Sequence, residues 1–434
     1  MAERARFFIF FRVIGHRVVL AALFLTVVFI GGCNGQPPGP GVTVVFKHAK
    51  LFGNPEPLDR LIGRFEAENP GIRVRRETLP SGSDSQHQFY VINLRAKSRA
   101  FDVFAVDVIW GQEFARAGWL TELDDLLPEA RRGAFFSGPI QAASYRGHLW
   151  AVPWFIDAGV LYYRRDLLAR YGFSPPKTWD ELVRAARTIA PREGIYGFLW
   201  QGKQYEGLVC NVMEYLWSGG GAVLDGNRVV LDSPPNRRAL RFVRGLIAPE
   251  AVTPAFVSTL TAEHSRRIFG DGRALCLRNW PYTWTLFQRP GSPVRGRVGV
   301  TALPHFPGHG SASTLRGWLL AINPHSRHPR AARRFLRFIT SPAAQKALAL
   351  AYGFQPTRKA LYEDAELVRA QPFLGELHGI FRHARPRPLT PLYVSVSQIL
   401  QSQFSAAVAG VRPPAEALRE GQTALERLFR RWPG

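Results

Sequence analysis

Cysteine is scarce in this sequence of 434 residues, which contains only three. So few cysteines exclude a fold held together by many disulfides. The sequence also lacks the CxxC, HExxH, GxxxxGK[ST] and GxSxG patterns that mark zinc sites, P-loops and serine nucleophiles. His305 and His309 are four residues apart, but Pro307 and Gly308 between them exclude a helical pair of metal ligands. The sequence therefore predicts no catalytic residues, no metal and no cofactor.

Acidic residues are also few. There are 33 Asp and Glu residues against 56 Lys and Arg, which gives a net charge of +23. Removing residues 1–32, with four Arg and one Glu, leaves 52 against 32, or +20. Such a charge is compatible with a nucleic-acid or membrane partner. The run most like a patch is Arg382-His383-Ala384-Arg385-Pro386-Arg387, but no recognised binding motif accompanies it. We expect an arginine-rich solvated surface and no nucleic-acid partner.

The length and the hydrophobic content are those of a globular protein. At roughly 100–200 residues per domain, the chain has room for two or three domains. Hydrophobic residues make up 46% and charged residues 21%, close to ordinary usage. Aromatic residues make up 12% and include 11 tryptophans, more than packing usually requires. This excess hints at a surface where aromatic rings meet a ligand.

The first 33 residues have the features of an export signal. Basic residues precede Val18 to Ile30, a run of 13 residues that is apolar apart from Thr26. A helix that spans a bilayer needs about 20 apolar residues, so the run fits a signal peptide better. It ends in Ile30-Gly31-Gly32-Cys33, which resembles a bacterial lipobox. Cleavage before Cys33 would leave its thiol for a diacylglycerol.

Residues 1–32 are thus predicted to be a lipoprotein signal peptide, with Cys33 as the lipidation site. Residues 33–41 are rich in Pro and Gly and are predicted to be a tether. The alternative is an uncleaved membrane anchor with an incidental cysteine. The folded body is expected to begin near Val42 and to lie outside the cytoplasmic membrane, in the periplasm or at the cell surface.

Strands and helices alternate along the body. The hydrophobic patterns predict strands over 42–46, 72–79 and 102–108, with helices through 58–65, 86–97 and 114–117 between and after them. This alternation is typical of a parallel sheet. Farther on, Thr178-Trp179-Asp180-Glu181 is a capping box that opens a helix. Further strands are predicted over 229–231, 274–277 and 318–322. Residues 298–303 lead back toward the last of these, and the chain is mostly helical after residue 357.

Several stretches, in this order, resemble the family 1 extracellular solute-binding proteins of ABC sugar transporters, and most of all the trehalose/maltose-binding lipoproteins. The resemblance covers about residues 42–410. It is carried by Phe65-Glu66-Ala67-Glu68-Asn69-Pro70-Gly71, by Asp102 through Phe114, by Ala151 through Leu168, by Tyr205-Glu206-Gly207-Leu208, by Asn279-Trp280-Pro281-Tyr282, by Gly317-Trp318 and by Arg385-Pro386-Arg387-Pro388-Leu389-Thr390-Pro391.

The resemblance implies an α/β, periplasmic-binding-protein-like fold. Two α/β lobes are joined by three hinge crossings, with a ligand cleft between them. We expect the crossings near Pro153, Leu303 and Gln355. Lobe one would then comprise residues 42–152 plus 304–354, and lobe two residues 154–302 plus 356–434.

A sugar site needs aromatic rings for apolar sugar faces and fixed carboxylates, amides or guanidiniums for hydroxyls. The resemblance implies that Asp107, at the end of a strand, and Trp110 contact sugar. The alternatives are a helix N-cap for Asp107 and packing beneath the helix for Trp110. It also places an aromatic ring at Phe155 and a sugar-binding carboxylate at Asp157, just past the first crossing. For Asp157 the alternative is capping at the hinge. Phe155 replaces a tyrosine that is usual in the relatives.

Further candidates follow later strands. Trp280 and Tyr282 flank Pro281, which holds the two rings in a set relation, and each could be a core aromatic instead. By resemblance, Gly317 lets a sugar approach the backbone, Trp318 is a platform, and Arg387 donates to hydroxyls or forms a hinge salt bridge. Arg316 replaces a glycine frequent in the relatives. Weaker candidates for ligand contacts are Glu56, Gln86, His87 and Glu206.

We therefore predict a binding protein, not an enzyme, that captures a sugar such as trehalose or maltose. Its partners would be the sugar, the permease subunits of an ABC transporter and, through the lipid, a membrane. It would act as a monomer. The alternatives are the same fold binding glycerol phosphodiester or a polyamine, or a secreted glycoside-acting enzyme. Cys210 and Cys276 are expected as two separate buried thiols, with a disulfide as the alternative.

Overall fold

The computed structural model describes residues 41–51, 54–80, 82–226 and 228–431. The predicted signal peptide, the lipidation site Cys33 and all of the predicted tether except Gly41 lie outside the described residues. The described residues form one compact unit by their contacts. In the described ranges, no helix is both long and apolar enough to cross a bilayer.

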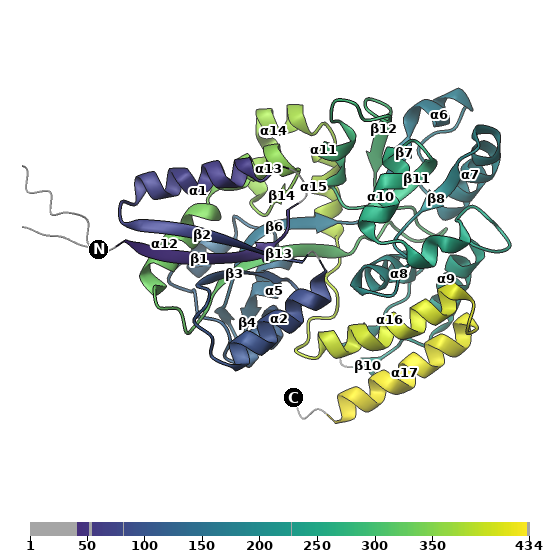
Figure 1. Cartoon of the computed structure of the whole chain (residues 1–434). Coiled ribbons are helices and arrows are strands. Elements are labelled where there is room, and N and C mark those ends of the chain that lie inside the picture. Colours follow the sequence, from purple (N-terminus) through teal and green to yellow (C-terminus); the bar gives the residue numbers. More distant parts are fainter. Residues whose placement is uncertain (1–40, 52–53, 81, 227, 432–434) are drawn as a thin grey trace, which may run out of the picture. The chain divides into compact units, whose positions relative to one another are not determined.

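Strands from the first 158 residues and two later strands build a six-stranded sheet with the order β14-β6-β13-β3-β1-β2 (Figure 1). Strands β1 and β2 and strands β1 and β3 are parallel, which confirms the predicted alternation. Strand β13 runs antiparallel to both β3 and β6. The strands are β1 (Val42–Ala49), β2 (Ile72–Leu79), β3 (Val103–Asp107), β6 (Val152–Ala158), β13 (Leu315–Ile322) and β14 (Gln355–Pro356).

Helices cover this sheet with the apolar faces that the sequence predicts. In α1 the buried residues are Leu58, Leu61, Ile62 and Phe65, the stripe expected of an amphipathic helix. The helices and short strands of this part are α1 (Glu56–Glu68), α2 (Ser83–Arg95), α3 (Gly111–Arg116), α4 (Glu129–Arg132), α5 (Ser137–Ala143), β4 (Ser144–Tyr145), β5 (His148–Leu149), α12 (Pro329–Ile339) and α13 (Pro342–Tyr352).

A second, four-stranded sheet has the order β12-β7-β11-β8. Its strands are β7 (Val160–Arg164), β8 (Tyr196–Leu199), β11 (Ala274–Asn279) and β12 (Val298–Thr301). The predicted capping box at Thr178 and Glu181 is present and opens α7. The other elements here are α6 (Arg165–Arg170), α7 (Trp179–Glu193), α8 (Glu206–Ser218), β9 (Leu224–Asp225), β10 (Arg228–Val229), α9 (Pro234–Gly245), η1 (Ala255–Thr259), α10 (Ala262–Gly270) and α11 (Thr283–Phe287).

The chain passes between the two sheets three times. It leaves the six-stranded sheet after β6, returns at β13, and after β14 continues into helices of which α16 and α17 pack on α8 and α9 (yellow in Figure 1). These last elements are η2 (Lys359–Glu363), α14 (Ala365–Ala370), α15 (Leu374–His383), α16 (Tyr393–Ala409) and α17 (Pro414–Arg430). Each sheet has its own large hydrophobic core, so the fold consists of two α/β lobes.

Strand β6 continues to Ala158, and its pairing partners are β13 and β14. The expected crossing near Pro153 therefore falls within a strand of the six-stranded sheet. Phe155 and Asp157 lie on that strand, before the chain reaches the second sheet, and not just past the crossing. The residue bounds that we expected for the two lobes remain a prediction.

Gly159 lies at this first passage between the sheets, beside a buried ion pair. Arg278 donates from Nε to Glu214 Oε2 (2.7 Å), and both side chains are 2% exposed. A Cβ atom at Gly159 would lie 2.2 Å from Glu214 Oε1. A larger residue would therefore displace the ion pair, which explains glycine at this position.

Candidate functional site

The register of three neighbouring strands brings most of the predicted lobe-one residues together. Trp318 in β13 is opposite Asp107 of β3 on one side and Phe155 of β6 on the other. Two residues earlier, Arg316 is opposite Asp157. Directly opposed residues have their side chains on the same face of a sheet. These five residues therefore share one face near the end of β3.

Arg387 joins this sheet to the second lobe. Its Nη1 donates to Glu206 Oε1 (2.7 Å), and its Nη2 donates to Asp107 Oδ1 (3.3 Å). The Arg387 side chain is 1% exposed. Burial acts to lower its pKa, but the neighbouring Cys210, Asp107 and Glu206 outweigh this effect and raise the pKa. Sequence reasoning left a sugar contact and a salt bridge open for Arg387, and the salt bridge is present. Its Nε atom has no hydrogen-bond partner among the described residues.

The two carboxylates are held from both sides. Glu206, the first residue of α8, also accepts from the Tyr393 hydroxyl (2.7 Å) and from the Ser397 hydroxyl, both on α16. Asp107 Oδ2 accepts from the Ser83 hydroxyl at 3.0 Å. The result is a hydrogen-bonded network that links β3 and α2 to α8 and α16.

A second group surrounds Trp280, which follows β11. The Arg278 guanidinium carbon lies 3.9 Å from the centroid of the Trp280 ring, and that of Arg316 lies 5.0 Å from it. Tyr282 donates its hydroxyl proton to Glu263 Oε1 at 2.6 Å. Trp280 and Tyr282 are 2% and 8% exposed and form a small cluster with Cys210. The structure thus brings these two rings beside the Arg316 side of the six-stranded sheet.

Asp157 is the most unusual group of the site. Its side chain is buried, and its Oδ1 atom has no hydrogen-bond partner within the described ranges. Burial raises the pKa of its carboxyl from 3.8 to about 7, while the charges of Arg316 and Arg278 oppose this change. An acceptor atom buried without a donor is costly, and a buried carboxyl with a shifted pKa beside charged partners is a candidate functional group.

The remaining candidates are involved in packing. Trp110 is 1% exposed and lies 5.8 Å from Trp318 and 5.9 Å from Phe114 between ring centroids. The position of Trp110 is therefore consistent with the alternative interpretation, in which this ring packs beneath the helix. Phe155 stacks on Phe354 at 4.0 Å. Trp318 is 4% exposed.

The weaker candidates His87, Gln86 and Glu56 lie in different surroundings. His87 shares a hydrogen bond with Glu113 (2.8 Å) and lies 5.5 Å from the Trp110 ring, so it belongs to the same neighbourhood. Gln86 donates to the backbone of Pro80 at 2.8 Å, and its buried Oε1 has no partner among the described atoms. Glu56 is exposed at the start of α1, where its described ion pair is with Arg60.

Gly317 has a structural reason that differs from the predicted one. A Cβ atom there would lie 2.8 Å from the backbone oxygen of Phe155 in the neighbouring strand. Close packing of β13 on β6 is sufficient to require glycine at this position. The predicted approach of a sugar to this backbone remains a prediction.

Sequence reasoning missed several members of the site. Ser83, Tyr393, Ser397 and Glu263 contact the predicted residues from distant parts of the chain and have no sequence signal of their own. Arg316 did have a signal, because it departs from the pattern of the resembling family, yet it was not among the candidates.

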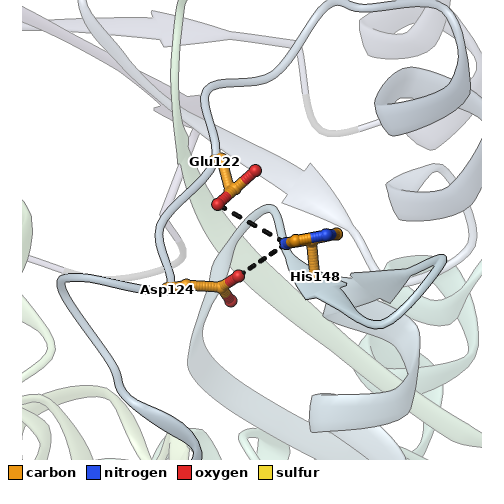
Figure 2. Close-up of side chains that lie close together, drawn as sticks. All are labelled: Glu122, Asp124 and His148. Atoms are coloured by element: carbon orange, nitrogen blue, oxygen red, sulfur yellow. Dashed lines mark hydrogen bonds and ion pairs between the residues drawn. The ribbon is translucent and has the colours of Figure 1, made fainter.

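Both thiols of the body are free and buried, as expected. Burial raises the pKa of Cys210 and of Cys276 to about 12, so neither is a thiolate at neutral pH. Among the described residues, one cluster has ligand atoms close enough for a metal ion, namely Glu122, Asp124 and His148 (Figure 2). His148 Nδ1 already contacts both carboxylates, at 3.5 and 2.8 Å, and Arg132 contacts Asp124, so a surface ion pair accounts for the cluster.

Three cavities of the described structure lie away from this group. The larger two, of about 450 and 320 Å³, are lined by residues of α5 and α15 and by residues around Phe135. None of the predicted site residues lines any of the three. The principal predicted residues instead contact one another or their neighbours and are at most 8% exposed. A sugar-sized solute can therefore reach them only when the surrounding side chains move apart.

The family model of bacterial extracellular solute-binding proteins matches residues 52–346. A "Probable ABC transporter-binding protein" of Deinococcus radiodurans is 38% identical over 372 residues, which are 82% of this chain and 87% of that protein. A "Mannitol-binding protein" of Pseudomonas aeruginosa is 25% identical over 406 residues, covering 86% and 90%.

Solved structures of solute-binding proteins are also similar to this chain. Maltose-bound MalE3 of T. maritima has 41% sequence identity and a TM-score of 0.86, covering 89% of this chain and all of that one. A solute-binding protein of Thermotoga lettingae bound to α-D-tagatose has 24% identity and a TM-score of 0.81, covering 90% of this chain and all of its own, and supports the fold alone.

Proposed function

Because the chain belongs to the bacterial extracellular solute-binding proteins, we propose that it captures a sugar of disaccharide size, such as maltose or trehalose, between its lobes. Members of this family are transport binding proteins and not enzymes, and they work outside the cytoplasm. The chain is accordingly the substrate-binding protein of an ABC transporter. The proposal concerns which solute it delivers to the permease.

The observation that carries the proposal is the likeness to a maltose-bound structure at 41% identity over nearly the whole chain. The residue types at the site are consistent with it. Trp280, Trp318 and Tyr282 offer rings for the apolar faces of a sugar, while Asp157 and Arg387 each have a buried atom without a hydrogen-bond partner among the described residues. Hydroxyl groups can both donate to Asp157 Oδ1 and accept from Arg387 Nε.

Binding would then depend on movement of the lobes. The site residues come from β3, β6 and β13 on one side and from α8, β11 and the segment before α16 on the other. We propose lobes of about residues 42–152 plus 304–354 and 154–302 plus 356–434. Solute would enter when the lobes separate, and the Asp107–Arg387–Glu206 contacts would re-form when they close.

The charges at the site favour a neutral solute. Arg278, Arg316 and Arg387 stand against the carboxylates of Asp107, Asp157, Glu206 and Glu214. Three cations against four acids give no excess of positive charge for a phosphodiester. The arginines equally disfavour a polyamine. A sugar alcohol is the second candidate, because a relative of 25% identity is a mannitol-binding protein.

We further propose that the protein is a monomer held at a membrane by lipid on Cys33, after cleavage of residues 1–32. Mass spectrometry of the natively produced protein would detect an acylated N-terminal cysteine. Cys33→Ala should accumulate as uncleaved precursor. A wild-type protein that begins at Met1 and carries no lipid would refute the anchor without touching the solute assignment.

The solute is tested by thermal unfolding of the purified protein with a panel of maltose, trehalose, sucrose, mannitol and tagatose, since a bound ligand raises the melting temperature. We expect maltose or trehalose to give the largest increase. A larger increase with mannitol would favour the sugar-alcohol alternative. No increase with any member of the panel would refute the proposal.

A further inference from the structure

Arg316 occupies a central position in the proposed site, although no sequence argument assigned it a role. It is opposite Asp157 across the β13–β6 pair, and its guanidinium lies 5.0 Å from the Trp280 ring centroid. Burial raises the pKa of Tyr205 and of Tyr282, and the charge of Arg316 opposes this rise. The guanidinium is thus surrounded by residues of both lobes.

The hydrogen-bonding capacity of Arg316 is not used within the described protein. Arg278, the other guanidinium on Trp280, donates to both oxygens of Glu214 and to Gln201. Arg316 is half-buried, and in the described part of the chain its side chain makes no hydrogen bond or ion pair. The Oδ1 atom of its opposite residue, Asp157, likewise has no donor. The Arg316 guanidinium and the Asp157 carboxyl therefore occupy opposed positions on neighbouring strands, and each can make further hydrogen bonds.

The hydrogen-bonding capacities of Asp157 and Arg316 restrict the solute groups that can bind to both residues. A hydroxyl group donates one proton and accepts through its lone pairs, so one hydroxyl, or two on adjacent carbons, can satisfy Asp157 and Arg316 together. A carboxylate on the solute would be placed beside the buried Asp157, and an amine beside Arg316. A cation–π contact with the Trp280 ring helps to hold the guanidinium in position before the solute arrives.

We propose that Arg316 is a solute-binding residue that acts with Asp157 as a donor–acceptor pair for hydroxyls and restricts the site to neutral carbohydrates. This inference rests on the proposed function, because it concerns the same site. The inference adds Arg316 to the proposed binding residues and specifies that the solute is uncharged. The Arg316 fork donates to hydroxyl oxygens, and Asp157 Oδ1 accepts from hydroxyl hydrogens.

The test is calorimetric titration of the purified full chain with maltose and with maltobionate, its carboxylated analogue. Arg316→Gln removes the charge and the fork, and Arg316→Lys keeps the charge. Arg238→Gln, on the exposed part of α9, is the matched control. We expect Arg316→Gln to weaken maltose binding roughly 10- to 100-fold, as loss of a charged hydrogen bond does. Arg316→Lys should fall between wild type and Arg316→Gln, and the control should bind as wild type does.

The outcomes separate the inference from the function on which it rests. If wild type binds maltose and Arg316→Gln binds it within about twofold of wild type, Arg316 is not a binding residue and the proposed function stands. If maltobionate binds wild type more tightly than maltose, the restriction to neutral solutes is wrong. If wild type binds neither, the proposed function fails and the inference fails with it. Should thermal unfolding show that Arg316→Gln does not fold, Arg316→Lys decides, and binding equal to wild type overturns the role of the fork.

Discussion

Replacing Asp157 by asparagine should make the ligand-free protein increasingly stable relative to wild type as the pH rises. In wild type, burial raises the pKa of the Asp157 carboxyl from 3.8 to about 7. Between these values the unfolded chain has released the proton and the folded chain has retained it. The folded state then binds more protons, so the free energy of unfolding falls as the pH rises through this interval. Above pH 7 the whole penalty is present, and below pH 4 it is absent.

The change in the free energy of unfolding follows from the difference between the two pKa values of Asp157. About three pH units, at about 1.4 kcal/mol each, give roughly 4 kcal/mol for a fully buried group. The asparagine amide is itself buried and costs about 1–3 kcal/mol at every pH. The variant should therefore be less stable than wild type near pH 4 and more stable near pH 8. The change between the two pH values, about 4 kcal/mol, is the quantity to compare.

Urea unfolding of both proteins at pH 4, 6 and 8 measures this quantity, because other titrating groups cancel in the difference. Asp364→Asn is a control without pH dependence in this range. A hydrogen bond from Lys346 lowers the pKa of Asp364 below 3.8, so its contribution to stability is lost only as the pH falls below about 4, and the difference between this variant and wild type should stay nearly constant from pH 4 to 8. A difference between wild type and Asp157→Asn that is constant within about 1 kcal/mol from pH 4 to 8 would refute the argument that Asp157 is a buried, costly carboxyl.

Three further outcomes can be measured on the same protein. Gly159→Ala should lower the free energy of unfolding by roughly 1–3 kcal/mol, because its Cβ would enter the ion pair at 2.2 Å, whereas Gly63→Ala, with nothing within 4 Å, should raise it by about 0.5–1 kcal/mol. Glu214→Gln should cost about 3–5 kcal/mol in urea unfolding, because its guanidinium partner stays buried without a counter-charge; a loss below 1 kcal/mol would contradict this. Alkylation of the unreduced, denatured protein should label both Cys210 and Cys276; no labelling would show that they are joined.

Local patterns predicted the elements well. The four apolar residues of α1 are buried as their spacing predicts, and the Thr178 capping box begins α7. Both depend only on neighbouring residues in a helix. Where burial is complete, local patterns mark the ends of an element less well. All of α8 is buried, including Glu206 at its start, so no apolar periodicity shows where this helix begins.

The site could be predicted only in part, because its contacts join distant segments. Arg387 contacts Asp107 across 280 positions and Glu206 across 181. No spacing rule links such residues, and they were found only through the family resemblance. The extent of β6 was missed for a similar reason, since pairing with β13 and β14 carries it past Pro153. The packing reason for Gly317 depends on the backbone of a neighbouring strand and is likewise invisible in the sequence.

A crystal structure of the protein grown with maltose would show whether a sugar is captured between the lobes. We expect one maltose in contact with Asp157 and Arg387, with an aromatic ring of Trp280 or Trp318 against a sugar face. Maltose bound elsewhere, for example in the cavity lined by His378 and Phe381, with the Asp157 neighbourhood unchanged, would contradict it.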